Sequence, residues 1–373
     1  MTEDKMTKLT RYGVIGCGMM GQEHLNNIAL LPDTQVGAIY EPNPDMAARA
    51  LTLAPNARLC GSIAELLAID DLDCIVIVSP NFRHLEQLEE IAATRALPIL
   101  VEKPLFTNPD HLARLEAFQA AYSAPVWVAM EYRFMPPIAA FLETVDEVTG
   151  GVKMLTIREH RFPFLKKVGD WNRFSRFTGG TFVEKCCHFF DLMRFVIRSE
   201  PVRVMASGSQ AENHLDETYD GETPDIFDCG YVIVEFANGA RAMLELCMFA
   251  EGSRYQEEVS AVGPMGKVEA LVPGPGRFWP AHLGEPPLPK LITSPRNSSG
   301  PIEVDIPVDK TLLAAGDHNG STFYQHQGFL DLVRGQRTLP EVDFNDGKMA
   351  VLIGMAAQKS MMENRVVTFG ELP

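Results

Sequence analysis

Several features that would place a protein in a membrane or an oxidising compartment are missing from these 373 residues. No run of about 18 uncharged apolar residues occurs, which argues against a membrane span. Residues Met1–Lys8 are polar and charged and lack the apolar centre of a signal peptide. The seven cysteines are scattered, odd in number and free of CxxC spacing, which is typical of reduced thiols. We therefore expect a cytoplasmic protein.

Positive charge is also scarce. Lys and Arg number 33 against 49 Asp and Glu, so the formal net charge is −16. Such a surface repels nucleic acid and anionic membranes, and we expect neither as a partner. One segment departs from this trend, because Lys153–Arg176 carries seven basic residues and only two acidic ones.

The first third of the chain alternates short apolar runs with amphipathic stretches. Strands are predicted at Tyr12–Ile15, Val36–Tyr40, Cys74–Val78, Ile99–Val101 and Val126–Ala129. Helices are predicted between them, at Gly21–Leu31, Pro44–Ala54, Ile63–Leu67, His84–Arg95 and Pro109–Tyr122. This alternation indicates an α/β domain with a parallel, doubly wound Rossmann sheet over residues 1–130.

The pattern changes over residues 131–373, where an α+β domain for substrate binding and oligomerisation is expected. Its predicted strands are Val202–Ser207, Cys229–Phe236, Ala240–Phe249, Gln256–Val262 and Gly266–Leu271, with Asn238-Gly239 as a hairpin turn. Helices are expected at Thr181–Arg198 and Ala350–Glu363, and surface loops at the acidic Glu212–Asp228 and the Pro/Gly-rich Pro273–Pro301. These elements indicate an open, mostly antiparallel sheet with helices on one face.

A glycine-rich fingerprint follows the first strand. Gly16-Cys17-Gly18-Met19-Met20-Gly21 has the GxGxxG spacing, with a strand before it and a helix after it. Gly16 allows the tight turn, Gly18 lets the backbone approach a pyrophosphate, and Gly21 lets helix and strand pack closely. The amides of Met19 and Met20 at the helix N-terminus suit the phosphates.

Glu41 follows the second strand, 20 residues after Gly21. A carboxylate there is placed to accept hydrogen bonds from a ribose diol and repels a 2′-phosphate. The sequence therefore predicts NAD rather than NADP as the cofactor.

Two further motifs follow strands of this domain. Ser79-Pro80-Asn81, with His84 three residues later, comes after the third predicted strand. Glu102-Lys103-Pro104 comes after the fourth, and both lie where open α/β sheets bind ligands. We expect Ser79, Pro80, Asn81, His84, Glu102 and Lys103 to border the cofactor, although His84 is also compatible with a purely local structural role.

With these motifs and the stretch from Gly179-Gly180 to Asp191, the sequence resembles the glucose–fructose oxidoreductase / inositol dehydrogenase (Gfo/Idh/MocA) family over nearly its whole length. The resemblance implies that Lys103 contacts the reacting hydroxyl of a sugar or cyclic polyol. It also implies a homodimer or homotetramer formed through the open sheet.

The acid–base residues are expected on the predicted helix Thr181–Arg198. Glu184 and His188 are i, i+4 neighbours there, and Asp191 follows His188 by three. His188 is the predicted general base, because alcohol oxidation requires removal of the hydroxyl proton. Glu184 replaces the family's usual Asp, which leaves three roles open: orienting His188, binding a substrate hydroxyl, or acting on a leaving group. Adjacent Cys186 and Cys187 point to different helix faces, so no metal site is predicted.

The basic segment before this helix suggests recognition of an anionic sugar, with a solvated face or a subunit contact as the alternative. The residues predicted to bind substrate are Tyr132, Arg133, Arg158, His160, Lys166, Trp171, Arg173, Asp191, His318 and Tyr324.

Three functions are compatible with these residues. The first is an NAD-dependent sugar or polyol dehydrogenase. The second is a redox-neutral NAD-dependent glycosidase, which oxidises transiently, eliminates the aglycone, adds water and returns the hydride. The resemblance of the Glu184–Phe190 stretch to NAD-dependent sulfoquinovosidases would give the second a sulfonated substrate. The third, a non-catalytic NAD sensor, fits poorly with an intact Lys103, Glu184 and His188.

Overall fold

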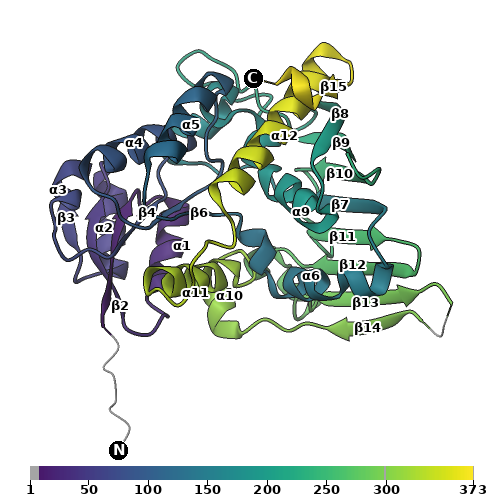
Figure 1. The fold of residues 1–373 in the computed structure, drawn as a ribbon, viewed down its shortest axis with the longest axis horizontal. Helices are drawn as coiled ribbons and strands as arrows, with labels where there is room; N and C mark the ends of the chain where they lie inside the picture. Colours follow the sequence, from purple (N-terminus) through teal and green to yellow (C-terminus); the bar gives the residue numbers. More distant parts are fainter. Residues whose placement is uncertain (1–7, 298–299, 373) are drawn as a thin grey trace, which may run out of the picture.

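The computed structural model describes residues 8–297 and 300–372, so the expectation for the first seven residues of the N-terminus lies outside it. Two β-sheets form the two halves of the molecule, and helices fill the space between them (Figure 1). Among the described residues, no helix combines the length and the apolar character that crossing a bilayer would require.

The first half is a six-stranded parallel sheet in the order β3-β2-β1-β4-β5-β6. Its strands are β1 (Thr10–Ile15), β2 (Thr34–Tyr40), β3 (Arg58–Cys60), β4 (Cys74–Ile77), β5 (Ile99–Val101) and β6 (Val126–Val128). The helices are α1 (Met19–Ile28), α2 (Pro44–Leu53), α3 (Ile63–Leu67), α4 (His84–Thr94) and α5 (Leu112–Ala121). This order is that of a Rossmann fold, as predicted. The sequence analysis missed β3, because a strand of three residues is too short to show a periodic pattern.

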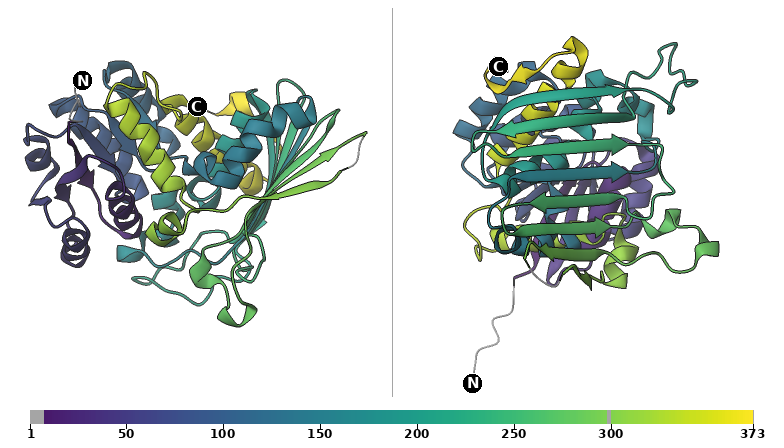
Figure 2. Two further views of the ribbon diagram at one scale, coloured as in Figure 1. Left: turned by 90° about the horizontal axis from the view of Figure 1, so that it is seen from below. Right: turned by 90° about the vertical axis from the view of Figure 1, so that its right-hand side faces the viewer.

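The second half is a nine-stranded sheet in the order β14-β13-β12-β11-β7-β10-β9-β8-β15. Its strands are β7 (Met154–His160), β8 (Pro201–Ser209), β9 (Cys229–Phe236), β10 (Arg241–Cys247), β11 (Glu257–Val262), β12 (Gly266–Val272), β13 (Lys290–Pro295), β14 (Ile302–Asp305) and β15 (Val367–Thr368). Among the described strands of this sheet, only β7 and β10 pair in parallel. Helices α6 (Pro136–Thr149), α9 (Cys187–Ile197) and α12 (Phe344–Glu363) lie on one face, and Figure 2 shows the other face open.

Three predicted boundaries were wrong. The helix over Thr181–Arg198 is interrupted at Lys185 and Cys186, which separate α8 (Thr181–Glu184) from α9. The loop predicted over Pro273–Pro301 contains β13, and α12 begins six residues before Ala350.

The central strand β7 was also missed. Its inward positions are Leu155, Ile157 and Glu159, and the buried glutamate masks the alternation of apolar and polar residues.

The chain returns to the first half near its end. Helices α10 (Lys310–Ala315) and α11 (Ser321–Val333) pack against α1, and the amide of Val128 donates to the carbonyl of Val342 at 3.1 Å. The segment between α11 and α12 therefore lies beside the carboxyl end of β6.

Candidate active site

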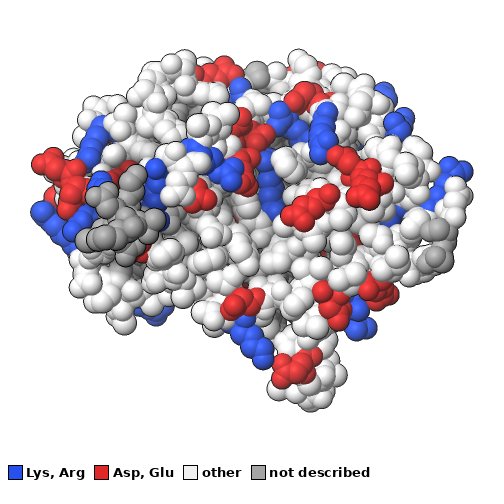
Figure 3. Space-filling view, turned by 60° about the horizontal axis from the view of Figure 1, so that its bottom comes forward, with Lys and Arg blue, Asp and Glu red and all other residues white. Residues whose placement is uncertain are grey.

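A pocket lies where α1, the ends of β5 and β6, the segment after β7 and the segment before α11 meet. Its lining comprises Met19, Met20, Glu23, Lys103, Glu131, Tyr132, Arg161, Phe162, Phe164, Leu165, Lys167, Glu184, Lys185, His188, Gln256, Pro275, Asp317 and His318. Figure 3 shows basic and acidic side chains mixed around the hollowed middle of one face. The lining thus combines residues from both halves of the chain.

The glycine loop at the edge of this pocket has the shape that a dinucleotide requires. Gly16 has a φ of +89°, and a Cβ there would lie 2.7 Å from the backbone of Ser79. A Cβ on Gly21 would lie 2.6 Å from the carbonyl oxygen of Gly16. A Cβ on Gly18, in contrast, would meet no described atom within 4 Å. The space beside Gly18 is therefore open, as close approach of a pyrophosphate demands.

The other residues predicted to border the cofactor lie around this loop. The Glu41 carboxylate accepts hydrogen bonds from the amides of Cys17 (2.6 Å) and Asn43 (2.8 Å). Asn81 is buried, and its Nδ2 has no hydrogen-bond partner among the described residues. That unused donor and the open space at Gly18 fit the cofactor.

His84 has a structural position. It is fully buried, and its ring nitrogens lie 2.8 Å from the carbonyl oxygen of Pro104 and 3.0 Å from that of Ser79. It ties together the loops that follow β4 and β5. Ser79 itself is held through a 2.5 Å hydrogen bond from its Oγ to Gln87.

Lys103 reaches from the loop after β5 to the break before α9. Its Nζ donates to the backbone carbonyl of Glu184 at 3.1 Å. Burial opposes its charge, but Cys187, Glu102 and Glu184 outweigh burial and raise the pKa of Lys103. The lysine is therefore a cation at neutral pH.

Glu184 is buried beside Lys103, and its Oε1 lies 3.3 Å from the Nζ of Lys167. Its Oε2 is buried without a partner among the described residues. One carboxylate oxygen is thus available to a bound molecule.

His188 lines the pocket from the first turn of α9. It is 2% exposed, and its imidazole stacks on the ring of Tyr132 with centroids 4.1 Å apart and planes 6° apart. Burial and then Lys103 lower the pKa of His188 well below its usual value. At neutral pH the imidazole is uncharged and can accept a proton.

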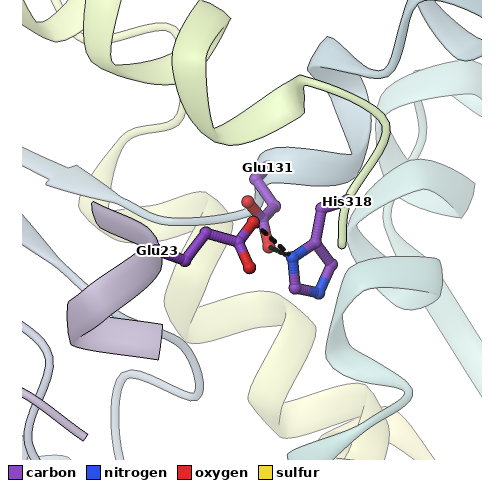
Figure 4. A group of neighbouring side chains, drawn as sticks. All are labelled: Glu23, Glu131 and His318. Atoms are coloured by element: carbon purple, nitrogen blue, oxygen red, sulfur yellow. Dashed lines mark hydrogen bonds and ion pairs between the residues drawn. The ribbon is translucent and has the colours of Figure 1, made fainter. Parts of the chain in front are cut away.

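A charged triad joins three segments at the pocket (Figure 4). The Nδ1 of His318 lies 2.8 Å from Glu23 and 3.7 Å from Glu131. Burial opposes the charge of His318, but Glu131 and Glu23 raise its pKa to about 9. The ligand atoms lie within 4.8 Å of one another, a spacing compatible with a metal ion. Because His318 is already a cation at neutral pH, it supplies the positive charge that the two carboxylates need.

Several residues predicted to bind substrate do not line the pocket. Arg133 and Asp191 are buried and paired with each other, with 2.6 Å between Nε and Oδ2. Arg158 pairs with Glu258, and His160 with Glu245, at alternate positions of β7 that face away from the buried core. These four side chains are therefore engaged in ion pairs outside the pocket lining.

The remaining predicted substrate residues also lie outside the lining. Lys166 is exposed beside Asp170, and Arg173 is buried against Glu217 of the acidic loop at 3.0 Å. The ring of Trp171 packs against Lys167, whose Nζ is 4.5 Å from the ring centroid. Tyr324 is 37% exposed on α11.

Of the predicted catalytic and substrate residues, the structure brings together Lys103, Tyr132, Glu184, His188 and His318 in the lining. The predicted site residues did not include Glu23, Glu131, Arg161, Lys185 or Gln256, which also line the pocket. Arg161 and Lys167 belong to the basic segment described above, and Lys185 is next to Glu184 in the sequence. The sequence therefore pointed to the segments that contain these three residues. Glu23 lies one turn into α1, and no motif in the sequence pointed to it.

Comparison with known proteins identifies the family. A family model described as "Oxidoreductase family, NAD-binding Rossmann fold" matches residues 10–130, and "Oxidoreductase family, C-terminal alpha/beta domain" matches residues 144–369. The chain belongs to the Gfo/Idh/MocA oxidoreductase family. It is accordingly an NAD-binding oxidoreductase, which confirms the predicted fold class and cofactor.

Several known proteins resemble most or nearly all of the chain. Myo-inositol 2-dehydrogenase of Thermotoga maritima is 24% identical over 366 residues, which is 97% of this chain and 99% of that protein. Inositol 2-dehydrogenase of Rhizobium meliloti is 27% identical over 261 residues, or 70% of this chain and 75% of that one. In fold, the chain matches the WlbA dehydrogenase from Bordetella pertussis in complex with NADH and UDP-GlcNAcA, with a TM-score of 0.74, 17% identity and coverage of 97% and 99%.

Proposed function

We propose that the protein is an NAD-dependent dehydrogenase that oxidises a secondary hydroxyl of a sugar or cyclic polyol. The observation that carries the proposal is the pairing, in one pocket, of an uncharged buried His188 with a charged Lys103. Curated relatives of the chain named as inositol dehydrogenases support the substrate class.

In this proposal His188 removes the hydroxyl proton. NAD supplies the hydride acceptor when it is bound beside Gly18. As the carbon–hydrogen electron pair leaves the carbinol carbon as hydride, the hydroxyl proton passes to His188. The products are a ketone, the reduced cofactor and a protonated imidazole.

Lys103 has a separate role in the same step. Its ammonium group stabilises the negative charge that develops on the substrate oxygen. The hydrogen bond from this group to the Glu184 carbonyl holds the ammonium in place before the substrate binds. Tyr132 holds the imidazole by stacking and so limits its orientation. The free Oε2 of Glu184 is placed to accept a hydrogen bond from a neighbouring substrate hydroxyl.

We also propose that the open face of the nine-stranded sheet carries a homo-oligomer contact. Met205, Ile233 and Met243 are cross-strand neighbours there, and the first two are 50% and 39% exposed. Apolar side chains in one row are typical of a surface that a second copy covers.

The test of the catalytic proposal follows NADH absorbance and free sugar together in the presence of NAD and a panel of sugars, polyols and glycosides. We expect NADH to accumulate in step with substrate loss. His188→Gln should lower kcat by roughly 10²- to 10⁴-fold, the usual contribution of a general base. His111→Gln, which alters a half-buried histidine in the turn before α5 and outside the pocket lining, is the matched control.

Two other outcomes would contradict the dehydrogenase. Sugar released from a glycoside without net NADH, and only when NAD is present, would identify a redox-neutral glycosidase. Tight NAD binding without turnover of any compound in the panel would favour a sensor. Full activity in His188→Gln would remove His188 as the base.

A further inference from the structure

A group of charged side chains beneath one wall of the pocket takes no part in the proposed chemistry. The Nζ of Lys185 lies 2.8 Å from Glu159 Oε1 and 2.6 Å from the Tyr132 hydroxyl. Arg161 Nη1 lies 3.4 Å from the same oxygen of Glu159. Lys185 and Arg161 line the pocket, whereas Glu159 is fully buried behind them. Two cations on the wall therefore share one carboxylate oxygen.

A second carboxyl group completes this arrangement. Glu257 on β11 is the antiparallel register partner of Glu159 on β7 and is also buried. Its Oε1 accepts a 2.6 Å hydrogen bond from Gln256. The Oε2 atoms of both glutamates are buried and have no partner in the described part of the chain. Two ionised glutamates can only accept hydrogen bonds. A protonated Glu257 could donate one.

The surroundings of Glu257 favour such a proton near neutral pH. Burial and then the charge of Glu159 raise the pKa of Glu257 to about 7, against the opposing effects of Lys185 and Arg161. The other titratable groups near this acid pair are Tyr132 and Cys186, and burial raises the pKa of each, so both are neutral. The charge of the group thus depends on Glu257.

With Glu257 protonated, Lys185 and Arg161 face a single negative charge and leave one positive charge in excess on the pocket wall. Most other charged groups of the lining are paired elsewhere: Lys167 with Glu184, His318 with Glu23 and Glu131, and Asp317 with Arg277. Lys103 is a further cation of the lining, and the proposed function assigns it to the reacting hydroxyl. The hydrogen bonds of Arg161 in the described structure use Nε and Nη1. Its remaining donor, Nη2, suits an oxyanion.

We infer that Lys185 and Arg161 form an oxyanion-binding subsite of the pocket, which takes a carboxylate or sulfonate group of the substrate, and that Glu257 controls the charge of this subsite. Assigning the oxyanion to the substrate rests on the proposed function, whereas oxyanion binding itself does not. A neutral Glu257 strengthens the subsite, and an ionised Glu257 cancels its excess charge. Burial also lowers the pKa of Lys185, so rising pH weakens the subsite through both groups.

The test uses inorganic sulfate as the probe and the full-length protein saturated with NAD, so that the dinucleotide site is filled. The sulfate dependence of the thermal midpoint gives an apparent Kd. It is measured at pH 6 and pH 8.5, with chloride at matched ionic strength. We expect sulfate to bind about tenfold more tightly at pH 6, because one full charge beside the site changes.

Three variants define the site. Glu257→Gln, which is close to isosteric, should lose most of the pH dependence of sulfate binding and keep only the part that Lys185 contributes. Arg161→Gln should weaken binding about tenfold or more at both. The double variant Lys185→Met with Glu159→Gln removes one charge of each sign, so that no buried charge is left alone, and should still lose binding. Lys153→Met, an exposed lysine at the start of the same basic segment, is the control and should match the wild type.

The outcomes separate this inference from the proposed function. If the sulfate pattern holds while no sugar is oxidised, the subsite stands and the dehydrogenase proposal fails. If Arg161→Gln binds sulfate as the wild type does, the subsite is wrong. If wild-type binding does not change between the two pH values, the role of Glu257 is wrong.

Discussion

At the scale of single residues, the surrounding charges give two buried bases opposite protonation states. His188 and Lys103 are both buried in one pocket, and burial disfavours the charge on each. Lys103 keeps its proton because the charges of Glu102 and Glu184 offset the effect of burial on its pKa. The charged groups that act most strongly on His188 are cations, which lower its pKa further. The pocket therefore offers one proton acceptor and one fixed positive charge at neutral pH.

Glu41 is the residue on which cofactor preference is expected to depend. In Glu41→Ala we expect the KM for NAD to rise roughly tenfold or more, since a hydrogen bond to a charged group contributes about 1.5–3 kcal/mol. The preference over NADP should fall as well, because the carboxylate that repels a 2′-phosphate is gone. The measurement is kcat/KM with each cofactor, and Asp45→Ala, an exposed acid on α2, serves as the control. An unchanged ratio of the two kcat/KM values would show that Glu41 does not contact the ribose.

At the scale of elements, the break between α8 and α9 shapes the pocket. A continuous helix would place Glu184 and His188 on one face by spacing alone. The interruption instead lets Lys185 also reach the pocket lining, between the two. Apolar periodicity could not reveal the break, because every residue from Thr181 to Met193 is buried.

The glycine loop before α1 gives a prediction that separates folding from cofactor binding. Gly21→Ala should lower stability by about 1–3 kcal/mol even without NAD, because its Cβ would crowd the carbonyl of Gly16. Gly18→Ala should leave stability almost unchanged, because its Cβ enters open space, and should weaken NAD binding at least tenfold. Thermal midpoints without NAD and NAD titrations of both variants provide the measurement. Equal NAD affinity in Gly18→Ala would mean that the pyrophosphate does not approach that position.

At the scale of the whole molecule, the triad of Glu23, Glu131 and His318 connects the two halves of the chain. Glu23 lies on α1 of the parallel sheet's domain, and His318 comes from the segment that returns before α11. Thr322 adds a 2.6 Å hydrogen bond to Glu131. These contacts close one side of the pocket.

This triad makes stability depend on pH. The folded pKa of His318, about 9, exceeds the unfolded value of about 6.5. The contribution of the triad is therefore fully present below about pH 6.5 and is lost as pH rises through 9. Between pH 6.5 and 9.5 the wild type should lose on the order of 2 kcal/mol more stability than His318→Gln, or a few degrees in Tm. Parallel Tm curves for the two proteins would contradict this role.

The sequence by itself determined the Rossmann half, the NAD fingerprint and the positions of Lys103, Glu184 and His188. Those features depend on local spacing: glycines at fixed offsets, strands followed by helices, and acid–base residues a few positions apart. The roles given to Lys103, Glu184 and His188 stay predictions.

Only the tertiary structure decided which distant charges meet. Glu159 and Glu257 face each other because β7 pairs with β11, and His318 reaches Glu23 across 295 residues. Likewise, Arg133 and Asp191, two predicted substrate ligands, are paired with each other because the segment after β6 packs against α9. Long-range pairing follows from strand register and helix packing, and no local pattern in the sequence records it.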